Sequence, residues 1–122
     1  MANPVIESSN TNTGTSTDTL VIIKPTDLSV GDLLVVKVGL YDVDDNNANW
    51  NTPAGWTLET ESSIGSSSLL TRTACFSKIA DSSDVSASDF TFTASTTVGY
   101  LAGYLARISG QATPSINIAE SD

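Results

Sequence analysis

The chain has 122 residues, with 14 acidic side chains, five basic ones and no histidine, so its formal net charge is −9. Scattered Lys and Arg cannot displace counterions from a phosphate backbone, which excludes nucleic-acid binding and anionic membranes as partners. The lack of histidine removes Ser–His and Cys–His catalysis and most zinc sites, and we expect no enzymatic activity.

The first part of the chain is polar. Residues 8–19 consist mainly of Ser, Thr and Asn, a composition typical of a flexible segment. Residues 20–24 are a β-branched run that predicts a strand ended by Pro25. We therefore expect residues 1–19 to form an N-terminal arm, with one possible short strand near Val5, and residues 20–122 to form the folded domain.

Residues 33–41 are the clearest strand of the sequence. Gly31 and Asp32 provide a turn before it. Apolar residues then recur at every second position, which places them on one face of a strand, and Gly39 argues against a helix. The apolar face holds Leu34, Val36, Val38 and Leu40; the other face holds Val35, Lys37 and Tyr41.

Four later segments alternate in the same way. They are residues 56–60, 69–79, 90–94 and 98–109, and polar stretches or turns separate them. No segment has a convincing helical period. Short strands with turn signals between them predict an all-β fold, specifically an antiparallel β-sandwich of about seven to eight strands.

The polar loop after residue 41 contains a candidate metal site. Asp42, Asp44 and Asn46 place oxygen ligands at alternating positions, as at the start of a calcium loop. The pattern then departs from the EF-hand, because Asn47 stands where glycine is required and Pro53 where a bidentate glutamate is required. The alternatives are a calcium site completed by distant ligands and a solvated acidic loop.

Two aromatic residues are candidates for contact with a sugar or another partner. Trp50 lies inside the polar loop, where we expect it to be exposed, and Tyr41 precedes that loop. Trp56 follows a Pro-Ala-Gly turn and is instead expected to cover the core. Sugar stacking by Trp50 and Tyr41 is one interpretation; a core function for these rings is the other.

Three further side chains have simple structural expectations. Cys75 is the only cysteine, which rules out an internal disulfide, and its neighbours predict a small buried thiol. Arg107 lies among apolar residues and is expected to pair with a carboxylate at the rim of the sheet. Lys37 is expected to face solvent or a neighbouring subunit.

The order of the turn and strand motifs resembles a known domain. The matching pieces are Pro25, residues 31–36, Pro53 to Thr57, residues 76–80, residues 90–93 and residues 108–110. They resemble the jelly-roll-like β-sandwich domain of tailed-bacteriophage structural proteins and of some secreted bacterial proteins. The resemblance covers residues 20–110, and its matched positions are turns and core, so it carries over no functional residue. Longer relatives continue with strands that complete a second sheet, and we therefore expect a partner to complete an open edge here.

The resemblance implies a non-enzymatic virion structural protein, most specifically a capsid decoration or outer-surface protein. Such a protein would bind the major capsid protein and its own symmetry mates, with a trimer favoured. The N-terminus has no signal-peptide pattern, which predicts synthesis in the host cytoplasm before placement on the virion surface. The alternatives are a carbohydrate- or cell-surface-binding module of a tail fibre or adhesin, and a strand-exchanging filament subunit.

Overall fold

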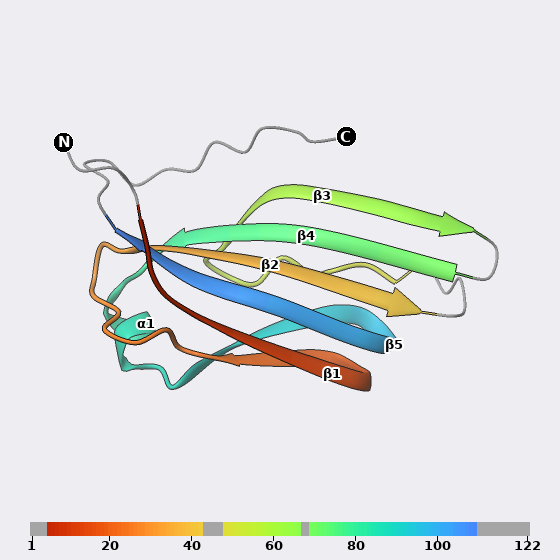
Figure 1. The fold of residues 1–122 in the computed structure, drawn as a ribbon, viewed down its shortest axis with the longest axis horizontal. Coiled ribbons are helices and arrows are strands. Elements are labelled where there is room, and N and C mark those ends of the chain that lie inside the picture. Colours follow the sequence, from red (N-terminus) through yellow and green to blue (C-terminus); the bar gives the residue numbers. More distant parts are fainter. Residues whose placement is uncertain (1–4, 43–47, 67–68, 110–122) are drawn as a thin grey trace.

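The computed structural model describes residues 5–42, 48–66 and 69–109 (Figure 1). These residues form one antiparallel sheet with the strand order β1-β5-β2-β4-β3, which confirms an all-β fold. The described part of the chain holds five strands rather than the seven to eight expected. The elements are β1 (Val5–Ile23), β2 (Leu33–Asp42), β3 (Thr57–Ser66), β4 (Leu69–Ile79), α1 (Ser82–Ser86) and β5 (Asp89–Ser109).

The lower strand count arises because β1 and β5 each join two predicted segments. They pair with each other along almost their whole length, and we call this pair the ribbon. Between the pairs Thr17↔Val98 and Thr19↔Thr93 the register shifts, and Ser16 adopts a positive φ of 50°. The ribbon turns at this point and returns along the sheet, as Figure 1 shows.

The returning half of the ribbon covers one side of the sheet, which we call the inner face. Its Leu20 and Ile22 side chains approach Gly103 so closely that a Cβ there would lie 2.8 Å and 2.9 Å from them. The first half of β1 is tied to the same cover through side-chain amides. Asn12 donates to the Val21 carbonyl, and Asn10 donates to the carbonyl of Ile23. The two halves of the ribbon are thus packed and hydrogen-bonded together.

The expectation of a flexible arm over residues 8–19 is therefore wrong. These residues belong to β1, and the boundary expected after residue 19 falls inside that strand. Thr is β-branched and favours strands, and the Asn side chains gain backbone acceptors from the ribbon. Composition alone indicated flexibility because these hydrogen bonds form between residues nine and 13 positions apart.

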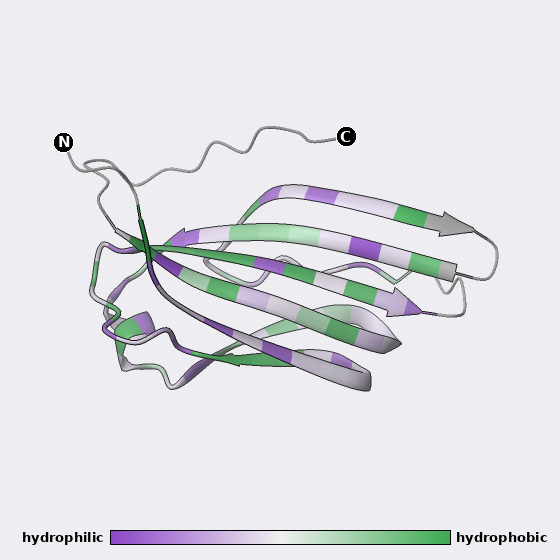
Figure 2. Ribbon diagram, viewed as in Figure 1, coloured by the Kyte–Doolittle hydropathy of each residue, from purple (hydrophilic) through white to green (hydrophobic). Residues whose placement is uncertain are grey.

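The core lies between the inner face and the returning ribbon. As predicted, the alternate positions Leu34, Val36, Val38 and Leu40 of β2 are buried, and Figure 2 shows the alternation of hydropathy along this strand. Phe76 of β4 and Phe92 of the ribbon are fully buried in the same cluster. Trp56 packs against this cluster, edge-on to Phe92 at 5.4 Å between ring centroids, which confirms its expected core function.

A short helix lies where the sequence indicated only a polar loop. Asp81 caps α1: its side chain accepts from the backbone N of Asp84, and the Asp84 side chain accepts from the backbone N of Asp81. This reciprocal pair is a capping box, and its Asp-x-x-Asp spacing is visible in the sequence. Across the described residues, no helix is long and apolar enough to span a membrane.

Candidate functional site

The two aromatic residues proposed from the sequence lie on opposite sides of the sheet. Tyr41 is 42% exposed on the side of the sheet away from the returning half of the ribbon. We call this side the outer face. Trp50 is only 8% exposed and belongs to the core cluster, so its expected exposure is wrong. The reason is an isolated β-bridge between Trp50 and Ala94, which holds the loop against the returning ribbon. Tyr41 and Trp50 therefore cannot form one sugar platform.

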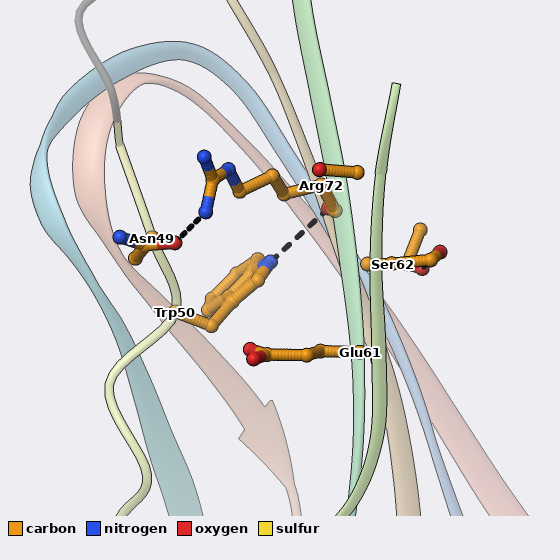
Figure 3. A pocket seen from close by; sticks show the side chains of 7 residues that line it. Asn49, Trp50, Glu61, Ser62 and Arg72 are labelled. Atoms are coloured by element: carbon orange, nitrogen blue, oxygen red, sulfur yellow. Dashed lines mark hydrogen bonds between the residues drawn. The ribbon is translucent and has the colours of Figure 1, made fainter. Parts of the chain in front are cut away.

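Trp50 instead forms part of the wall of a small cavity between the Asn49–Trp50 segment and strands β3 and β4 (Figure 3). Its indole Nε1 donates to the backbone oxygen of Arg72 at 3.3 Å. The Arg72 guanidinium donates to the side-chain oxygen of Asn49. Figure 3 shows the Arg72 and Glu61 side chains extending toward the loop that carries Asn49 and Trp50. The cavity has a volume of about 270 Å³ and also contacts Ser62, Ser63 and Thr73.

The chemistry of this cavity suits a small polar ligand. It combines an aromatic ring with a carboxylate on Glu61 and an amide on Asn49, the groups that orient hydroxyls in binding sites. Its volume lies just below the range of ~300–1,000 Å³ that is usual for ligand pockets. Sequence reasoning identified Trp50 but missed Glu61 and Arg72, because only the pairing of β3 with β4 brings them together.

The candidate calcium ligands are only partly described. Asp42 ends β2 opposite Leu70 and is buried, with 6% of its surface exposed. Asp44 and Asn46 lie outside the described residues. Within the described ranges, no group of three or more His, Cys, Asp or Glu residues is arranged to hold a metal ion.

The outer face carries all three tyrosines of the chain. Tyr41, Tyr100 and Tyr104 are each 40–42% exposed. Strand register places Tyr41 beside Tyr100, and Tyr104 beside Lys37. Gly39 pairs with Ala102 midway between these two rows, two residues away from each. These small residues form the floor of a shallow trough of about 430 Å³.

The outer face is also nearly free of charge. Its central rows, as strand register defines them, contain Ser9, Thr11, Thr13 and Thr15 of β1; Tyr100, Ala102, Tyr104 and Ala106 of β5; Val35, Lys37, Gly39 and Tyr41 of β2; Thr71, Thr73, Cys75 and Ser77 of β4; and Thr57, Glu59, Thr60, Ser62 and Ile64 of β3. Lys37 and Glu59 are the only charged residues in this set. A protein with 14 acidic residues thus places one of them here. Depletion of charge and enrichment in Tyr are features of the centre of a protein interface.

Cys75 lies in the middle of the outer face between Lys37 and Thr60. It is 6% exposed, which confirms the predicted buried thiol. Burial raises the pKa of this thiol; the Lys37 ammonium acts in the opposite direction and the Glu59 carboxylate in the same direction. A thiol in this state is a weak nucleophile, so Cys75 is not a catalytic candidate.

Comparison with known proteins gives no match to this chain, either among protein-family models, among curated proteins or among solved structures.

Proposed function

We propose that the chain is a non-enzymatic structural subunit of a bacteriophage virion, specifically a capsid decoration or outer-surface protein. The resemblance of residues 20–110 supplies the virion context. The ribbon over the inner face supports the sandwich-type packing that this resemblance implies, and the jelly-roll-like strand order is part of the proposal. In this role the chain binds the major capsid protein and symmetry mates on the virion surface, after synthesis in the host cytoplasm.

The long edge strand β1 carries this proposal. Within the described residues, β1 pairs on one side only, with β5, along a strand of 19 residues. Natural edge strands are protected by charged side chains, by Pro, by bulges or by being short. Val5–Ile23 is long and contains no Lys or Pro; its protection is limited to Glu7, Asp18, two register shifts and the Asn side chains that donate to the carbonyls of Val21 and Ile23. Its apolar side chains at Val21 and Ile23 are 37% and 68% exposed. Such an edge is suited to pairing with a strand of another chain.

Binding to virus particles tests the proposal. Immunogold labelling of purified particles is expected to place the chain on the capsid surface, and the purified chain should co-sediment with particles that lack it. Ile23→Lys adds an edge charge without disturbing the core and should weaken this binding at least about tenfold. Ser86→Lys, an exposed change on α1, is the matched control. Absence from particles, or equal binding by both variants, would contradict the proposal.

A second candidate is a carbohydrate-binding module, because of the cavity beside Trp50. Here the Glu61 carboxylate would accept hydrogen bonds from sugar hydroxyls. A glycan array probed with and without a chelator tests this function and the calcium site together. Specific glycan binding that Glu61→Gln abolishes would favour the module. Glycan binding that the chelator abolishes but Glu61→Gln does not would indicate calcium at Asp42.

The third candidate is a filament subunit in which copies exchange strands. It uses the same β1 edge but produces an open polymer instead of a closed assembly. Light scattering after size-exclusion chromatography separates a trimer, the assembly expected from the sequence, from a polymer of increasing mass.

A further inference from the structure

We propose that the outer face binds the outer face of a second copy of this chain, with a two-fold axis along the trough. A two-fold contact requires a surface that is complementary to itself. The outer face meets this requirement in shape, charge and area.

The rows of the outer face are spaced symmetrically about the trough. On β2, Lys37 and Tyr41 lie two residues before and two residues after Gly39. On β5, Tyr104 and Tyr100 lie in the same way on either side of Ala102. A two-fold axis along the Gly39–Ala102 trough therefore places each row over the opposite row of the second copy. By strand register, the Lys37–Tyr104 row and the Tyr41–Tyr100 row flank the small residues Gly39 and Ala102, so the two faces can interdigitate.

This arrangement forms specific contacts. Lys37 of each copy lies over the Tyr41 ring of the other, a cation–π contact. Tyr104 of each copy lies over Tyr100 of the other, and aromatic pairs of this kind are favourable beyond their buried area. All four side chains are supplied by one surface, as a two-fold contact requires.

The charge of the chain favours this face over the others for contact between two copies. Two chains of net charge −9 repel each other, so they approach best through the surface with the fewest acids. Within the central rows of the outer face given above, only Glu59 is acidic, and it accepts a hydrogen bond from Ser77 Oγ at 2.5 Å. The like charges of the two copies then lie mainly at the periphery, where solvent and salt screen them.

The size of the face is sufficient for a specific contact. Five strands at a spacing of about 4.8 Å and ten residues at about 3.4 Å each give a face of about 800 Å². A standard protein interface buries about 800 Å² on each partner. Sheets that pack face to face do so with their strands rotated by about 30°, an angle that arises from the twist of each sheet.

The test is the mass of the chain in solution. Sedimentation equilibrium at about 100 µM should give twice the 12.7 kDa of one chain, since this concentration populates a pair with a micromolar Kd. Ala102→Arg fills the trough and should weaken pairing at least about tenfold. Lys37→Glu should do the same by placing an acid over Tyr41, whereas Lys37→Arg keeps the cation and should pair like the wild type. Thr91→Arg is the matched control, because it introduces the same arginine at an exposed position of the returning ribbon.

Circular dichroism melting confirms that each variant is folded. A mass of one chain at every concentration, a mass of three chains, or wild-type pairing by Ala102→Arg and Lys37→Glu would overturn the inference. The inference would also be overturned if the chain has the mass of one copy and binds a glycan, and if Tyr41→Ala abolishes that binding. This result would assign the trough to a sugar. The edge variant Ile23→Lys lies on another surface, so failure of the pair and failure of particle binding are separately visible.

Discussion

The Arg107 guanidinium lies 3.4 Å from the Asp32 carboxylate, so an ion pair joins the turn before β2 to the end of β5. Both side chains are largely buried, at 14% and 17% exposure. Asp32 also accepts from the backbone N of Ser29, and Arg107 Nε donates to Ser8 Oγ. This confirms the expected pairing of Arg107 with a carboxylate at the sheet rim. It also shows that one arginine connects three separate segments of the chain.

We predict that Arg107→Met lowers the free energy of unfolding by about 2 kcal/mol, because it leaves the Asp32 carboxylate with less compensation in a largely buried position. Asp32→Asn should cost less, since an amide oxygen can still accept from Ser29. In urea titrations the double variant should reveal a coupling energy of about 1 kcal/mol. Additive effects of the two substitutions would mean that the ion pair adds nothing to stability.

Gly103→Ala tests the packing of the returning ribbon on the inner face. The added Cβ would lie 2.8 Å from Leu20 Cδ2 and 2.9 Å from Ile22 Cδ1, and both of these side chains are fully buried. Overpacking of this kind typically costs about 1–3 kcal/mol, and we expect a loss of unfolding free energy in that range. Gly99→Ala in the same strand is the control, because its nearest contact would be an ordinary 3.5 Å. Equal stability of the two variants would indicate that the ribbon is not held against Gly103.

Acid sensitivity at α1 follows from the cap. The hydrogen bond from the Ser83 hydroxyl, then the bond from the Asp84 backbone N and the Lys78 ammonium, lower the pKa of Asp81 from 3.8 to about 2. The unfolded chain therefore takes up this proton first as the pH falls. The stabilisation is complete above about pH 4 and is lost as the pH falls through about 2.

The variant Asp81→Asn isolates this effect, because Asn also caps helices but does not titrate in this range. Between about pH 5 and about pH 2.5, the urea concentration at the midpoint of unfolding should fall further for the wild type than for the variant. Parallel decreases in the two proteins would show that the Asp81 carboxylate does not contribute.

The individual strands were predictable because alternation and β-branching are local signals. Residues 69–79 were expected as a strand and form β4 with the same limits, and residues 33–41 differ from β2 by one residue. The break expected between residues 94 and 98 coincides with the turn of the ribbon, where the register shifts between Val98 and Thr93. It did not indicate that β1 and β5 stay paired on both sides of the turn, because the paired residues lie between 66 (Ile23↔Asp89) and 104 (Val5↔Ser109) positions apart.

The candidate sites were less predictable for the same reason. Tyr41 was placed on an exposed face because the period of two decides the face of a strand. Trp50 was expected to be exposed because its neighbours are polar, but the bridge to Ala94 buries it. The same period of two puts Tyr100 and Tyr104 on one side of their strand. Their proximity to Lys37 and Tyr41 required the β2–β5 register.

The reactivity of Cys75 tests directly whether its thiol is inaccessible in the native sheet. Because the thiol is 6% exposed and burial raises its pKa, little thiolate is accessible in the native state. With Ellman's reagent at about pH 8, native Cys75 should react at least about a hundredfold more slowly than the same thiol in urea. Ser86→Cys in a Cys75→Ser background provides an exposed thiol as control. If native Cys75 reacts as fast as this control, β4 is accessible and the outer face is not closed around the thiol. A slow rate that does not change with reagent concentration would instead show that labelling waits for the opening of the central strands.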